Sequence, residues 1–371
     1  AHLNTTLDAN FVINSLTFTG PGTPADTSNV TIASGGLGTN TLTIEAGSGV
    51  GILVNSTSAA HTISANVILG GDQTWTNGST GAFTVSGTVS SSTNSNLTVA
   101  GTGNTVISGA IQTGAGGLTK NDSGALTLSG TNTYSGATNV NGGKLIVSGS
   151  LAGSVNVNST GGVAGTLAGG SFGSASSIAG DLNVAADATT TQVGGTVAPG
   201  GLPADATTGV LNVAGNVILG SVGAGVAHLD ITLGGTTAGS TYDQIAMSAG
   251  NLALTNVELD GALIYAPTVG DTYYIIAGAG TTSGTLAFAN QQAPDGLSAG
   301  LNTITFGGQE FAISFTALYN GGVGSQFTGA GNDVALMAVP EPASLSMLVG
   351  SFGLALGLQR FRRRNRTALR A

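Results

Sequence analysis

The sequence predicts an all-β protein: a right-handed parallel β-helix, a solenoid with a C-terminal cap and a short C-terminal hydrophobic helix. Apolar side chains alternate with polar ones in short segments, so that Leu126 and Leu128, for example, point to one face of a strand. Turns rich in Gly, Asn and Ser separate these segments at intervals of roughly ten residues. Charged residues make up only 7% and aromatic residues 5% of the chain. A solenoid tolerates this shortage of bulk because each coil buries only a narrow aliphatic strip against the next.

The composition argues against disorder and against several globular domains in the 371-residue chain. Hydrophobic residues reach 41% and the mean hydropathy is +0.31, whereas disordered chains combine low hydrophobicity with high charge. We expect a parallel β-helix body at 1–240. Ten of the eighteen aromatic residues lie between 240 and 338, where larger side chains can cover an otherwise open solenoid end. We therefore expect terminal coils and a β cap at 241–338, followed by a separate segment at 339–371.

Charge is distributed unevenly along the chain, whose formal net charge is −9. Residues 1–338 contain only two cationic side chains, Lys120 and Lys144, against sixteen acids, while all six arginines lie in the last twelve residues. An acidic surface without arginine repels phosphate backbones, so nucleic acid is not an expected partner. The absence of cysteine excludes disulfides and thiolate metal sites.

The stretch 116–150 reads GGLTKNDSGALTLSGTNTYSGATNVNGGKLIVSGS. It resembles the autotransporter-associated β-strand repeat, whose pattern is matched here by Leu118, Thr119, Lys120, Gly124, Leu126, Leu128, Ser129, Gly130, Asn132, Thr133, Tyr134, Gly136, Thr138, Val140, Gly143 and Leu145. Asp122 stands where the family often has Gly, in a predicted turn. The resemblance implies a parallel β-helix on a bacterial cell surface and no catalytic activity.

Other parts of the body show looser repetition. The pentapeptide 66–70 (NVILG) recurs exactly as 216–220, without a fixed period between such copies, as in an irregular β-helix. Residues 150–206 are nearly free of aromatic side chains, and a linker is the alternative interpretation there. The chain starts with Ala1 rather than Met, so we expect that an N-terminal signal peptide was lost or that the chain was cropped.

The C-terminal segment has three parts in order. Pro340, Glu341 and Pro342 form a Pro-Glu-Pro motif, an apolar run follows at 343–358, and a basic cluster comes last, comprising Arg360, Arg362, Arg363, Arg364 and Arg366. This order resembles the PEP-CTERM sorting signal. The resemblance implies sorting by an exosortase-like protease, a transient stay in the inner membrane, and delivery to the cell surface or extracellular matrix.

The length of the apolar run is compatible with a membrane helix. A helix over 343–358 would be about 24 Å long, against a hydrocarbon core of roughly 30 Å, and snorkelling arginines extend its reach. The basic cluster predicts a cytoplasmic C-terminus and an external body. An ordinary tail anchor or a buried helix is the alternative.

The sequence offers little for catalysis, and we expect no enzyme, no catalytic residue, no metal site and no cofactor. His2, His61 and His228 are the only histidines and show no metal-binding spacing. The Gly-x-Ser-x-Gly pattern at 169–173 matches a nucleophile elbow, but an elbow requires a helix directly after it, and no helix is predicted there. Calcium could be bound by Asp181, Asp187 and Asp205 or by the turn at 329–336, but scattered loop acids and a last strand are the favoured interpretations.

The leading functional hypothesis is a secreted, non-enzymatic structural or adhesin-like surface protein, with exopolysaccharide or matrix as a possible partner and homo-oligomers or filaments as open alternatives. The second hypothesis is a β-helix that binds or processes polysaccharide. Trp75 or Tyr134 could then stack on sugar rings.

Overall fold

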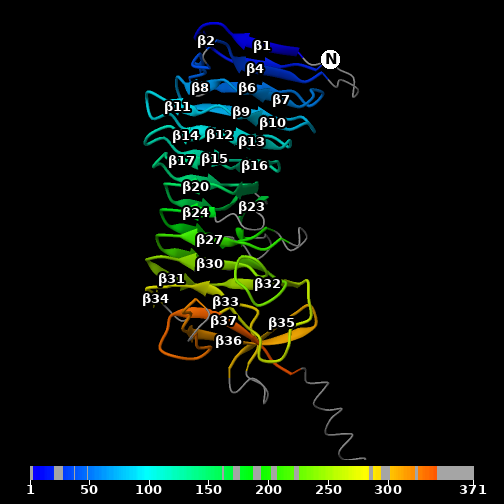
Figure 1. Cartoon of the computed structure of the whole chain (residues 1–371), viewed down its shortest axis with the longest axis vertical. Coiled ribbons are helices and arrows are strands. Elements are labelled where there is room, and N and C mark those ends of the chain that lie inside the picture. The colour runs from blue at the N-terminus through cyan, green and yellow to red at the C-terminus, as the bar shows by residue number, and fades with distance from the viewer. Residues whose placement is uncertain are drawn as a thin grey trace, which may run out of the picture.

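A computed structural model of the protein describes residues 3–20, 28–36, 38–47, 49–160, 163–169, 176–186, 194–201, 207–220, 225–283, 287–293, 301–321 and 325–340. All the regular elements in these ranges are strands, stacked into one long column (Figure 1). The predicted all-β parallel β-helix is confirmed. The predicted helix at 343–358 lies outside the described residues. Within the described ranges, no helical segment has the length and hydrophobicity of a membrane span.

The column has three sides because each strand pairs in parallel with the strand three positions later in the chain. The first side contains β1 (Leu3–Leu7), β4 (Val30–Ser34), β7 (His61–Ile63), β10 (Phe83–Val85), β13 (Thr105–Ile107), β16 (Ala125–Leu128), β19 (Gly143–Val147), β23 (Val163–Gly169), β26 (Thr196–Ala198), β29 (Ala227–Leu233) and β32 (Val257–Leu263). The short β22 (Ser159–Thr160) precedes β23 and pairs with it in the antiparallel direction. Its addition interrupts the three-strand count along the chain but not the stacking of the coils.

The second side begins with β2 (Phe11–Ile13), β5 (Thr41–Ile44), β8 (Asn66–Leu69), β11 (Val89–Ser91) and β14 (Ile111–Gln112). A second ladder follows on this side and contains β17 (Thr131–Asn132), β20 (Ser150–Leu151), β24 (Ser176–Ile178), β27 (Val210–Val213), β30 (Gln244–Met247) and β33 (Thr272–Ala277). The third side contains β3 (Leu16–Phe18), β6 (Val50–Val54), β9 (Gln73–Asn77), β12 (Leu97–Ala100), β15 (Leu118–Lys120), β18 (Thr138–Val140), β21 (Val155–Val157), β25 (Leu182–Val184), β28 (Val217–Leu219), β31 (Asn251–Leu254) and β34 (Thr281–Ser283).

The coils differ in length, as the loose repetition of the sequence predicts. Hydrogen bonds between adjacent coils join residues 22 apart at Asn66 and Thr88, 17 apart at Asn139 and Asn156, and 35 apart at Asp181 and Asn216. The two copies of NVILG even lie on different sides, since 66–69 form β8 on the second side and 217–219 form β28 on the third. Identical sequence therefore does not mean an equivalent place in the coil.

The core is a continuous column of inward side chains. Alternation places both Leu126 and Leu128 fully inside, and a single cluster of buried apolar residues extends from Leu7 to Ala338. Described residues between 150 and 206 supply β20 to β26 and take part in the same ladders. The linker interpretation is wrong for these strands, because small side chains are enough to fill a coil.

The strand direction changes at the C-terminal end. β33 pairs in parallel with β30 on one edge and antiparallel with β37 (Asp333–Ala338) on the other. β37 then pairs with β36 (Gln309–Ala317), which pairs with β35 (Thr303–Phe306), both antiparallel. These three strands, orange at the bottom of Figure 1, lie across the end of the column. We call β33, β35, β36 and β37 the cap.

Candidate functional site

The third side carries an array of asparagines on its outer surface. In β18, β21 and β25 the central residues Asn139, Asn156 and Asn183 point outward, because their neighbours on both sides along the strand are buried. A second row follows where the strands end, formed by Asn121, Asn141 and Asn158. We call these two rows together the asparagine face.

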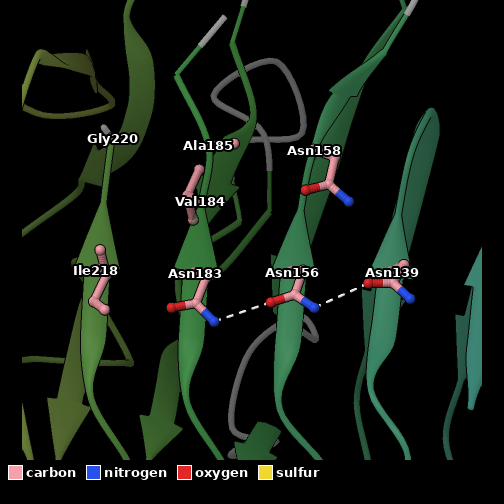
Figure 2. Close-up of a pocket in the computed structure, with 8 residues that line it drawn as sticks. All are labelled: Asn139, Asn156, Asn158, Asn183, Val184, Ala185, Ile218 and Gly220. Atoms are coloured by element: carbon pink, nitrogen blue, oxygen red, sulfur yellow. Dashed lines mark hydrogen bonds between the residues drawn. The ribbon is translucent and has the colours of Figure 1, made fainter. Parts of the chain in front are cut away.

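Amide-to-amide hydrogen bonds link the residues within each row. Asn156 Nδ2 donates to Asn139 Oδ1, and Asn183 Nδ2 donates to Asn156 Oδ1, both at 2.9 Å (Figure 2). In the second row Asn158 donates to Asn141, and Asn141 to Asn121, both at 3.0 Å. Each amide has two N–H donors and two acceptor lone pairs, so these bonds leave hydrogen-bonding capacity that faces solvent.

A shallow hollow of about 310 Å³ lies over this face. Its lining comprises Asn139, Asn156, Asn158, Asn183, Val184, Ala185, Ile218 and Gly220. Ile218 is paired in register with Asn183 and is 41% exposed, which gives the hollow an apolar edge (Figure 2). None of these lining residues is charged. The arrangement can form hydrogen bonds to a neutral ligand, but it offers no side chain for acid–base chemistry.

The sequence contained a signal for this face that the sequence analysis missed. Asn-Val-Asn occurs at 139–141 and again at 156–158, with the valine buried both times. In the sequence, two such copies look like the ordinary alternation of a strand. The structure shows that one coil spans 17 residues here, so that Asn139 and Asn156 lie side by side on adjacent coils.

In the repeat segment, Lys120 is a buried side chain that stabilises the coil. Its side chain points into the coil and is 1% exposed. Its Nζ donates to the backbone carbonyls of Asn121, Asp122 and Gly142, the last two at 2.9 and 3.3 Å. Burial lowers the pKa of Lys120 to about 8, although the nearby Asp122 carboxylate opposes this shift. Lys120 therefore closes a corner of the coil and does not face a ligand.

Asp122 and Asn132 also act on the backbone. Asp122 has a φ of 57°, in the left-handed region, which explains why the related repeats often have Gly at this position. Its Oδ2 accepts a hydrogen bond from Gly101 N at 2.9 Å. Asn132 is buried where the ladder between β14 and β17 is interrupted: its Oδ1 accepts from Ile111 N, and its Nδ2 donates to Ser150 O, both at 3.0 Å. The Asn132 amide thus bridges the gap in the second side.

The prediction that Trp75 or Tyr134 could stack on sugars is wrong. The two side chains are only 1% and 0% exposed. Trp75 Nε1 donates to Gln73 Oε1 at 2.9 Å, and the Tyr134 hydroxyl shares a 2.6 Å hydrogen bond with Thr138 Oγ1. Both rings occupy inward positions, where they fill the coil and have their polar atoms satisfied.

The calcium alternatives gain no support from the described residues. The Asp181 carboxylate accepts from Asn216 N at 2.7 Å and from Asn216 Nδ2 at 3.1 Å. The Asp333 carboxylate accepts from Gly278 N and Tyr319 N, at 2.6 and 2.8 Å, and Asp333 begins the last strand. Asp187 and Asp205, and residues 170–173 of the Gly-x-Ser-x-Gly match, lie outside the described residues.

The sorting motif lies at the edge of the described structure. Pro340 is the last described residue and follows Val339, whose backbone N donates to Glu310 O at 3.1 Å in the cap. Glu341, Pro342 and the basic cluster Arg360, Arg362, Arg363, Arg364 and Arg366 lie outside the described residues. The assignment of these residues to a sorting signal stays a prediction.

Comparison with known families bears on the central repeat. Residues 118–147 match the passenger-associated-transport-repeat family, and no curated protein matches the chain. This match confirms the autotransporter-associated repeat. The chain is thus a parallel β-helix protein that carries a passenger-associated transport repeat, and this repeat indicates an exported surface protein.

Proposed function

We propose that the protein is a non-enzymatic structural component of the cell surface or extracellular matrix, with an adhesin-like role. The observation that carries this proposal is the stacking of parallel coils from β1 to β34, with ladders that are continuous on the first and third sides and with the transport repeat inside it. Such a column presents a long side surface on a rigid support, which is typical of solenoids that bind extended partners.

The C-terminal tail supports export through an exosortase-like system. The Pro-Glu-Pro motif begins directly after the cap, so a protease at this point would release the folded body without cutting a strand. The experiment is to express the full chain, with an export signal, in a bacterium that has an exosortase. The mass of the surface-associated protein is then measured by mass spectrometry. We expect loss of the basic cluster from the mature protein, and retention of it in a variant with Pro340, Glu341 and Pro342 changed to Ala. Mature protein that keeps Arg362–Arg364 would refute processing.

A second function, binding of a neutral polysaccharide, is favoured by the asparagine face. The hollow combines amide groups that keep part of their hydrogen-bonding capacity with the exposed Ile218 side chain, and its lining residues carry no charge although the protein is acidic overall. The amides recur once per coil, with strands about 4.8 Å apart, which suits a ligand that is itself a repeating chain. Hydroxyl groups would bond to the amides, and the apolar face of a sugar ring would contact Ile218.

Affinity electrophoresis of the full chain in gels containing neutral or uronate-rich polysaccharides tests this second function. We expect retardation by a neutral polysaccharide that is reduced in the double variant Asn156→Thr, Asn183→Thr. The matched control is Thr98→Ser, an outward residue of β12 on the same side but outside the hollow. Equal retardation of all three proteins would contradict binding at this face. Release of shortened glycan by the wild type would instead indicate processing and overturn the non-enzymatic assignment.

A further inference from the structure

A second cluster of polar side chains lies on the first side, near the cap. Strands β29 and β32 are adjacent and parallel, and they carry His228-Leu229-Asp230 and Glu258-Leu259-Asp260 in matching register. His228 is paired with Glu258, and Asp230 with Asp260. Both leucines are buried, so all four ionisable side chains lie on the outer face of the sheet.

Three of these side chains bring their ligating atoms together. His228 Nδ1 lies 2.7 Å from Asp260 Oδ2 and 3.8 Å from Glu258 Oε2. One ligand atom from each of His228, Glu258 and Asp260 can be chosen so that all lie within 4.8 Å of one another. The Glu258 and Asp260 side chains are 37% and 44% exposed, so the cluster is open to solvent.

Within the part of the chain that the structure describes, no lysine or arginine balances the charge of the cluster. Three carboxylates face one imidazole, and the only lysines before residue 338 are Lys120 and Lys144, on β15 and β19, several coils away from β29. A salt bridge between His228 and Asp260 neutralises at most one of the three negative charges. A divalent cation bound to the neutral imidazole, Glu258 and Asp260 would replace this salt bridge and neutralise two of the three negative charges.

We propose that His228, Glu258 and Asp260 bind a divalent transition-metal ion of the zinc type. An imidazole nitrogen and carboxylate oxygens are ligand types that zinc accepts, and three protein ligands leave a fourth position for water. The imidazole argues against calcium and magnesium, which prefer oxygen ligands. Because the ligands come from two hydrogen-bonded strands of adjacent coils, the ion would join these coils beside the cap. This inference is independent of the proposed surface function.

Isothermal titration of the full chain with Zn²⁺ tests the proposal. We expect one ion per chain, and at least about a tenfold loss of affinity in His228→Gln and in Glu258→Gln, since each variant loses one of three ligands. The matched control is Glu45→Gln, the same change at an exposed acid after β5 on the second side, which should leave the affinity unchanged. Circular dichroism of each variant checks that it is folded.

A second readout separates specific binding from weak attraction of cations to an acidic surface. Zn²⁺ should raise the thermal midpoint of the wild type and of Glu45→Gln, because binding to the folded state stabilises it, and should raise that of His228→Gln less at the same zinc concentration. The proposal is overturned if no stoichiometric zinc binding occurs, or if His228→Gln binds zinc as tightly as the wild type. Tighter binding of Ca²⁺ than of Zn²⁺ would also overturn it, since that would mark an oxygen-only site.

Discussion

The middle coils and the cap differ in how their strands pair and in which side chains fill their core. In the middle coils, β15, β18 and β21 stack in parallel and bury aliphatic pairs such as Val155 and Val157. In the cap the strands run antiparallel and the buried side chains are larger. Tyr273 and Phe311 of the cap meet edge to face with ring centroids 6.0 Å apart, and Tyr273 meets Tyr242, which precedes β30, at 5.5 Å.

The difference shows how a β-helix is continued and how it is stopped. The last strand of a parallel coil presents unpaired backbone N–H and C=O groups, as the strand before it did, so another coil can always pair with it. On the second side β33 ends this series, because its other edge pairs with β37 in the opposite direction. In the middle, stability is spread over many similar interfaces between neighbouring coils, whereas the cap depends on a few large side chains.

The largest expected effect is in the cap. Phe311→Ala should cost about 3–5 kcal/mol, because it leaves a cavity beside Tyr273 in a fully buried position. Hydrogen exchange should accelerate in β36 and β37 and stay unchanged in β15, β18 and β21. Phe11→Ala, at a ring 47% exposed on β2, is the control and should have little effect. Equal acceleration along the whole column would contradict a locally stabilised cap.

The next effect concerns the one buried lysine of the middle coils. Lys120→Ala should cost about 2–3 kcal/mol, since the carbonyls of Asn121, Asp122 and Gly142 lose their buried donor. Urea unfolding measures this loss. Lys144→Ala, in the same repeat but only partly buried, should cost clearly less. If both variants lose the same stability, the corner contacts of Lys120 are not the cause.

A smaller effect should appear as a dependence on pH at the junction between coils and cap. Asp243 is fully buried, with its oxygens accepting from Gly209 N and Thr232 N at 2.8 and 2.9 Å, yet burial raises its pKa from 3.8 to about 7. Between pH 4 and 7 the folded state therefore holds a proton that the unfolded chain has lost, and stability falls as the pH rises.

We expect a loss on the order of 1–2 kcal/mol between pH 5 and pH 7, measured by urea unfolding at both values. Asp243→Asn should reduce this slope. It should not abolish the slope, because burial also raises the pKa of Asp230, to about 6. Stability that increases from pH 5 to pH 7, or an unchanged slope in Asp243→Asn, would show that Asp243 does not hold its proton in the folded state.

The smallest effect belongs to the asparagine face. Asn156→Thr removes two partly exposed amide hydrogen bonds, and threonine already occupies the equivalent outward positions 98 and 119, so the expected cost is below about 1 kcal/mol. Thermal unfolding measures it. A loss as large as that of Lys120→Ala would mean that the row stabilises the coils, and would weaken its interpretation as a binding surface.

Local features of the fold follow directly from the chain. Alternation predicts that Leu126 and Leu128 are buried, and the family pattern predicts a turn at Asp122 where the backbone is indeed left-handed. These predictions hold because side-chain direction in a strand and left-handed turns depend on a few neighbouring residues. The inward direction of Trp75 and Tyr134 was missed, because amphipathic aromatic rings are equally suited to a core or a surface.

The sequence by itself determined that the chain forms many short strands, that the side chains they bury are mainly aliphatic, and that a transport repeat lies among them. Only the tertiary structure decided which strands became neighbours, because that depends on coil lengths that vary along the chain. His228 meets Asp260 across 32 residues, and Asn139 meets Asn156 across 17. Coils of different length still stack with their inward side chains in register, so the outward contacts are set by the closure of whole coils around a common core.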